Sequence, residues 1–96
     1  MTTNTGVVTE NWQTIDAITG VALVDSINYT IQNVGDKRMY VRESTAMPAP
    51  SDVGHIVTPA SDEGDSSFIG QQSGTNMYVK TTITGDVTSV AITETP

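Results

Sequence analysis

The chain is 96 residues long and carries 11 acidic against 4 basic side chains, so its formal net charge is -7. This length fits one domain with a thin core, because so small a domain buries only about 60–65% of its unfolded surface. The absence of cysteine excludes disulfides and thiolate metal sites, and a single histidine excludes a multi-histidine metal centre. The basic residues are too few for a nucleic-acid-binding track, so we expect no nucleic-acid partner.

The first ten residues lack the basic start and apolar run of a secretory signal, so we expect synthesis in the cytoplasm. Residues 1–10 also contain too little apolar surface to fold alone, and we predict a flexible amino-terminal arm that orders against a neighbour. The longest mostly apolar stretch, Ile18 to Val24, falls short of the ~20 residues that span a bilayer. A membrane partner is therefore not expected.

The composition favours strands. Val, Ile and Thr together fill 35 of the 96 positions, whereas Leu occurs once. Branching at Cβ disfavours helix and packs well on a pleated surface. Residues 11–96 are therefore predicted to form a single all-β domain without a long helix.

The first predicted strand lies around residues 11–16, where Trp12 either caps the core or anchors a contact. Alternation predicts a second strand over 27–33 and a third over 38–43. The turn chemistry at 34–37 predicts that these two strands form a hairpin.

A long proline-containing loop is predicted at about 44–65, because Pro48, Pro50 and Pro59 exclude a helix and a central strand. A short strand within 53–58 is compatible with this pattern. Loops of about 20 residues in compact domains tend to be functional or to lie on a partner.

Three further strands, at 67–72, 77–83 and 87–93, are predicted to form a meander. The expected architecture is a small antiparallel β-sandwich or a jelly-roll-like barrel. Alternation predicts a mostly buried set of side chains, namely Ile27, Ile31, Met39, Val41, Met77, Val79, Val90 and Ile92.

Two near copies, Met39 to Arg42 and Met77 to Lys80, occur in the two halves of the chain. They represent either a repeated hairpin or a coincidence of common strand residues. In both cases alternation places Tyr40, Arg42, Tyr78 and Lys80 on the face opposite the core. Together with Trp12, these residues form the candidate interface, since interface cores favour aromatic residues and Arg. The alternative is that they are scattered surface side chains.

No catalytic, metal or cofactor site is predicted. The acidic run Asp62 to Asp65 could bind Ca²⁺, but it lacks the spacing of an EF-hand and is interpreted as a solvated loop. His55, Asp52 and Ser51 lack the elbow motif of a hydrolase. Glycine-rich phosphate cradles are absent. The protein is therefore predicted not to be an enzyme.

The aromatic residues leave a second possibility open. Trp12, Tyr29, Tyr40, Phe68 and Tyr78 could include a stacking platform for a sugar, as in a carbohydrate-binding or adhesion module. The alternative for these rings is packing in the core and at interfaces.

Five segments carry a resemblance to a known class of protein. Residues 27–43, 47–50, 54–59, 74–80 and 87–94 follow one another as strand, turn, strand, proline-containing connection and further strands. In this order they resemble small structural proteins of tailed bacteriophages. Met77 stands where that group has Leu, and the acidic run at 62–65 replaces its usual proline-glycine turn.

The resemblance implies a virion component, a capsid decoration (cement) protein that binds and stabilises the lattice of the major capsid protein. A head-fibre, head-tail or tail component is the nearest variant. It also implies a homo-oligomer, by analogy a trimer. The expected location is the capsid exterior, after assembly in the host cytoplasm.

Overall fold

The computed structural model describes residues 3–24, 27–59, 67–71 and 76–95, without the side chains of residues 3, 67–71 and 95. This part of the chain contains eight strands and one short helix, and the predicted all-β class is confirmed. The elements are β1 (Thr3–Val8), β2 (Gln13–Thr14), α1 (Ile15–Thr19), β3 (Asn28–Asn33), β4 (Met39–Ser44), β5 (His55–Val57), β6 (Ser67–Gln71), β7 (Asn76–Thr81) and β8 (Thr88–Thr95). None of the described helices is long and apolar enough to cross a membrane.

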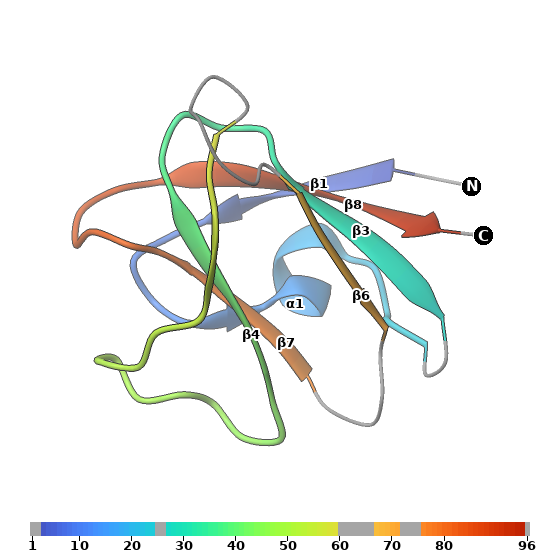
Figure 1. Cartoon of the computed structure of the whole chain (residues 1–96), viewed down its shortest axis with the longest axis horizontal. Helices are drawn as coiled ribbons and strands as arrows, with labels where there is room; N and C mark the ends of the chain where they lie inside the picture. The colour runs from blue at the N-terminus through green and yellow to red at the C-terminus, as the bar shows by residue number, and fades with distance from the viewer. Residues whose placement is uncertain (1–2, 25–26, 60–66, 72–75, 96) are drawn as a thin grey trace.

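The strands form two four-stranded antiparallel sheets, with the orders β1-β8-β3-β6 and β2-β7-β4-β5 (Figure 1). The pairs β1–β8, β2–β7, β3–β6 and β4–β5 are those of one long hairpin folded at its middle. Rolling that hairpin adds the contacts β3–β8 and β4–β7. This is the arrangement of a jelly roll, one of the two predicted architectures.

The core lies between the two sheets. Ile31, Met39, Met77, Val79 and Val90 are wholly buried there. Val41 and Ile92 are buried with them, and Ile27 packs against this cluster as a partly buried side chain. The predicted core is thus confirmed, and Val8, Ile15, Tyr29 and Val57 complete it.

The predicted hairpin over 27–43 is wrong, because β3 and β4 belong to different sheets. Their connection crosses the edge of the sandwich close to β8, where Val34 N donates to Ser89 O at 2.9 Å. A Cβ on Gly35 would lie 2.0 Å from Thr88 Oγ1, so only glycine fits this approach. The predicted meander is wrong for the same reason, since β6, β7 and β8 alternate between the sheets.

The crossing is tied to the core by one buried amide. Asn33 Nδ2 donates to Lys37 O at 2.5 Å and to Val57 O at 3.0 Å. Asn33 Oδ1 accepts from Thr88 Oγ1 at 2.9 Å and from Gly35 N at 3.2 Å. This single side chain therefore joins the β3–β4 connection to β5 and β8.

The amino-terminal region differs from its predicted form. The expected flexible arm over 1–10 contains β1, which pairs residue by residue with β8 and ends in the buried Val8. The expected strand at 11–16 extends only over β2, because α1 begins directly after it. Thr14 caps α1 by accepting from Ala17 N at 3.3 Å, and Gly20 ends it at φ 76°.

Candidate interaction site

The candidate site is the outer face of the β2-β7-β4-β5 sheet. The register of β4 and β7 places Tyr40 opposite Lys80 and Arg42 opposite Tyr78, with Val41 opposite Val79 between them. The two near copies in the sequence are therefore neighbouring antiparallel strands, and each tyrosine faces a cation of the other copy. They do not form a hairpin in each half of the chain.

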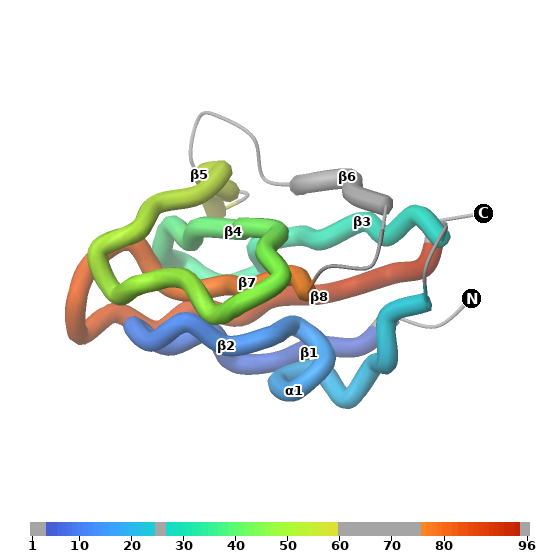
Figure 2. Tube along the Cα trace, turned by 90° about the horizontal axis from the view of Figure 1, so that it is seen from below, coloured from blue at the N-terminus to red at the C-terminus, as the bar shows by residue number. Residues whose placement is uncertain are grey.

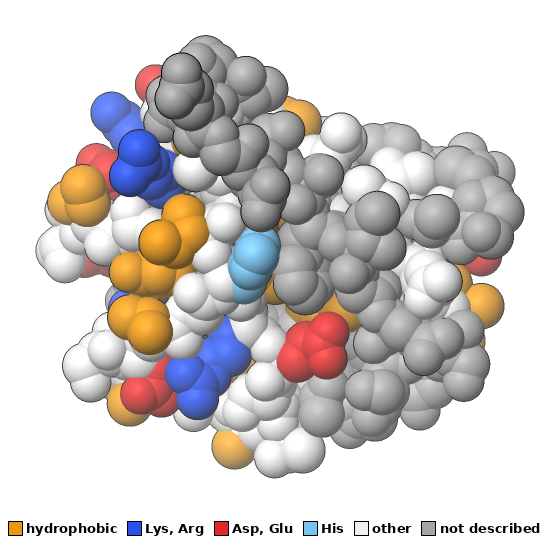
Figure 3. Space-filling view, viewed as in Figure 1, with side chains coloured by type: hydrophobic (Ala, Val, Ile, Leu, Met, Phe, Trp, Pro, Cys, Tyr) orange, Lys and Arg blue, Asp and Glu red, His pale blue; other side chains and the backbone are white. Residues whose placement is uncertain are grey.

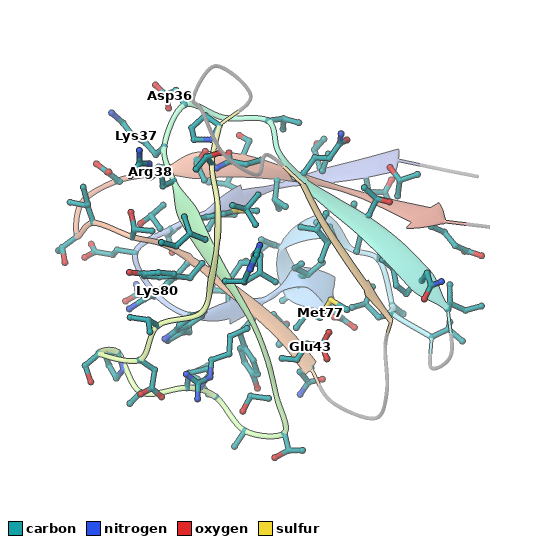
Figure 4. All side chains as sticks on the ribbon, viewed as in Figure 1. Asp36, Lys37, Arg38, Glu43, Met77 and Lys80 are labelled. Atoms are coloured by element: carbon teal, nitrogen blue, oxygen red, sulfur yellow. The ribbon has the colours of Figure 1, made fainter. Side chains whose placement is uncertain are left out.

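Lys80 lies near the carboxyl end of β7 on this face (Figure 4). Its Nζ is 5.1 Å from the centroid of the Trp12 ring and 6.0 Å from that of Tyr40. The two rings are 6.4 Å apart and tilted by 33°. An ammonium within about 6 Å of a ring is attracted to its face, so Lys80 and the two rings stabilise one another.

Three side chains of this face bind the backbone of the loop at 45–54. Trp12 Nε1 donates to Ala49 O at 2.9 Å, and Arg42 Nη1 donates to Val53 O at 2.8 Å. Lys80 Nζ donates to Pro50 O. Within the loop, Ala49 and Asp52 are joined by two hydrogen bonds, one from each backbone N–H. The loop is thus held at three points against the sheet and braced internally between Ala49 and Asp52.

The clamped loop and β5 expose apolar side chains to solvent. Met47 is 65% exposed and Val53 60%, and Ile56 on β5 is 47% exposed. Ile56 lies opposite Tyr40 in the register, so it continues the row of Tyr40 and Lys80. Figure 3 shows apolar side chains gathered beside His55 on this side of the molecule. We call Met47, Val53 and Ile56 the apolar patch.

A shallow pocket of about 140 Å³ lies beside the loop. It is lined by Glu10, Asn11, Trp12, Met47, Pro48 and Pro50. The volume suits a single side chain rather than a sugar or a nucleotide, since pockets for small molecules hold about 300–1,000 Å³.

The structure thus brings all five candidate interface residues to one face but gives them different roles. Trp12 and Tyr78 are only 5% and 6% exposed, and they lie beneath the surface rather than on it. Arg42 and Lys80 hold the loop. The strongly exposed apolar side chains on this face are those of the apolar patch, which the sequence pattern did not identify. The available signal was the length and proline content of the loop.

The remaining sequence candidates form no site in the part of the chain that is described. His55 is an exposed residue of β5. No group of three or more metal-ligating side chains occurs among the described residues. The acidic run Asp62 to Asp65 and the side chain of Phe68 lie outside the description. Lys37 and Arg38 are beside Asp36, away from Lys80 (Figure 4).

The comparisons with known proteins give no relative. No protein-family model, no curated protein and no solved structure matches this chain.

Proposed function

We propose that this protein is a non-catalytic structural component of a tailed-bacteriophage virion, a capsid decoration protein that binds the major capsid protein. The observation that carries the proposal is the clamped loop, which together with β5 presents the apolar patch in a fixed position. The virion assignment itself comes from the sequence resemblance over residues 27–94.

The physical argument is one of preorganisation. A loop that is already ordered loses little conformational entropy on binding, so more of the contact energy becomes affinity. Exposed apolar side chains gathered on one surface are typical of protein interaction sites. A decoration protein needs such a surface, because many copies must seat in the same orientation on a lattice.

The alternative of sugar binding has less support from the geometry. A stacking platform requires an exposed ring face, whereas Trp12, Tyr29 and Tyr78 are nearly enclosed. Among the described aromatic residues, Tyr40 alone is more than slightly exposed. Retention of the protein on a polysaccharide column would favour this alternative.

The decisive experiment uses phage particles whose genome encodes the chain. Full-length protein is expected to migrate with the heads in a density gradient. The double variant Met47→Asp, Ile56→Asp is expected to lose at least tenfold in head occupancy, with an unchanged Tm of the free protein. Ile83→Asp is the matched control, because Ile83 is 63% exposed in the connection before β8. Full occupancy of the double variant would overturn the proposed site, and absence of the wild-type protein from particles would overturn the assignment.

A further inference from the structure

A pocket of about 300 Å³ lies at one end of the sandwich. Strands β1, β3 and β8 supply its polar side, and the segment after α1 supplies an apolar wall, formed by Val21, Ala22 and Val24. Figure 2 shows this segment, in light blue, at the end of the molecule where both termini lie. The volume reaches the range of pockets that hold small molecules, about 300–1,000 Å³.

Three polar side chains line the pocket from neighbouring strands of the β1-β8-β3-β6 sheet. Glu94 of β8 lies opposite Tyr29 of β3, and Asn4 of β1 lies opposite Ile92, two residues before Glu94. Alternate residues of a strand share a face, so Glu94 follows the buried Val90 and Ile92 on the inner face of β8. The apolar pattern of this face thus ends in a carboxylate, and departures from such patterns are expected at functional sites.

The apolar wall of the pocket is held in place by two hydrogen bonds. Val24 N donates to Tyr29 Oη at 2.8 Å, and Leu23 N donates to Asp16 Oδ2 at 3.3 Å. Tyr29 is itself only 3% exposed, so the first of these bonds ties the wall to a side chain of the core. A wall fixed in this way loses little conformational entropy when a ligand binds.

We propose that this pocket binds a primary ammonium group carried on a short alkyl stem. An ammonium of this kind has three N–H donors and no acceptor. The pocket offers three oxygen acceptors, the carboxylate of Glu94, the amide oxygen of Asn4 and the hydroxyl oxygen of Tyr29. The apolar wall covers the alkyl stem. The site shares no residue with the apolar patch and is independent of the proposed function.

Charge distinguishes among ligands of this size. The chain has a net charge of -7, and none of the described residues that line the pocket is basic. Asp16 adds a second carboxylate behind the wall through its bond to Leu23 N. An anionic ligand is therefore repelled. A neutral alcohol lacks the charge-assisted hydrogen bonds that an ammonium makes to a carboxylate, so it should bind more weakly.

Titration of the full chain, followed by amide NMR, tests the site with three probes of equal length: n-butylammonium, n-butanol and butyrate. Butylammonium is expected to shift the amide signals of residues 21–24 saturably, with an affinity at least about fivefold above that of butanol. Butyrate is expected to leave these signals in place. Equal affinity for the ammonium and the alcohol, or the absence of a saturable shift, would overturn the proposal.

A charge-removing variant assigns the binding to this pocket. Glu94→Gln keeps the size of the side chain and is expected to lower the affinity for butylammonium at least about fivefold. Glu43→Gln is the matched control, because Glu43 is an exposed glutamate near the end of β4 in the other sheet and should leave the affinity unchanged. An equal loss in both variants would indicate general attraction to an acidic chain and would overturn the site.

A fourth probe identifies the source of the ammonium. Nα-acetyl-lysine methylamide presents the same group on a peptide unit. Tighter binding of this probe than of butylammonium identifies the ligand as a lysine side chain of another protein, whereas weaker binding identifies it as a free small amine.

Discussion

Lys80 joins three parts of the molecule that are distant in sequence. Its ammonium lies over the rings of Trp12 and Tyr40 and donates to the carbonyl of Pro50 in the loop. The charge therefore contributes to stability through the loop clamp rather than through a salt bridge. This role differs from the direct contact that the sequence pattern predicted.

Lys80→Met tests this role, because methionine keeps most of the aliphatic stem but removes the charge. We expect a loss of about 1–2 kcal/mol in the free energy of unfolding, from the cation–π contact and the hydrogen bond. Hydrogen exchange should accelerate in residues 45–54. Thermal unfolding and exchange measurements check these effects. Lys37→Met is the control. An equal loss of unfolding free energy in both variants would contradict the role of Lys80 in holding the loop.

Asn33 illustrates a second kind of residue, a polar group in the core. It is 1% exposed and takes part in four hydrogen bonds. Alternation correctly places it on the core face of β3, but the residue type alone does not indicate a buried position. The chain crosses between the sheets directly after Asn33, and the four hydrogen bonds at this crossing explain why the amide is buried.

Asn33→Ala should destabilise the protein by about 2–4 kcal/mol, because it leaves buried carbonyl and hydroxyl groups without partners. Urea unfolding measures this loss. The same change at Asn28, an exposed residue of the same strand, should cost less than about 1 kcal/mol. A similar small effect at both positions would show that water replaces the amide of Asn33.

At the scale of elements, β1 changes what is expected of the amino-terminal segment. Deletion of residues 1–8 should lower stability by several kcal/mol, since it removes the buried Val8 and a six-residue ladder on β8. Urea unfolding of the truncated chain checks this. An unchanged midpoint would restore the interpretation of this segment as a passive arm.

Strand positions and core faces were predictable from the sequence, whereas the connections were not. Alternation correctly predicts that Met39 and Val41 face inward. The same alternation occurs whether β4 forms a hairpin with β3 or crosses to the facing sheet, so it does not indicate the connection. Strand β1 was missed because the prediction for residues 1–10 followed their low apolar content, although four of the six residues of β1 are the β-branched Thr or Val. Helix α1 has five residues, too few for a helical period to be recognised.

The candidate site was predictable in part for a similar reason. Alternation identifies the outward positions of Tyr40 and Lys80, because it depends on local geometry alone. The contacts of Trp12, Arg42 and Lys80 with loop carbonyls depend on the folding of the loop at 45–54 over the sheet. Backbone acceptors carry no signal in the sequence, so these contacts between the loop and the sheet were not predictable.

At the scale of the whole molecule, both sheets share one thin core. Val41 and Val79 lie opposite each other on its central strands and are buried. Either residue changed to Asp should unfold the protein, because burial of an unpaired carboxylate costs more than a small domain can tolerate. Near-ultraviolet circular dichroism and amide dispersion in NMR measure this. Val53→Asp, on the exposed loop, should fold normally; a folded Val41→Asp would show that the faces are misassigned.

The rolled-hairpin pairing also sets the order in which the native contacts can form. Strands β4 and β5 are close in sequence and can meet early, whereas β1 and β8 are the farthest apart and close the largest loop. Strand β8 lies between β1 and β3 and is the last strand in the chain, so β1 and β3 cannot join one sheet until β8 has paired with both. Such nonlocal topologies fold in milliseconds to seconds rather than microseconds. During that interval β1 has no strand to pair with, and its uncharged sequence contains no residue that opposes pairing with another nascent chain.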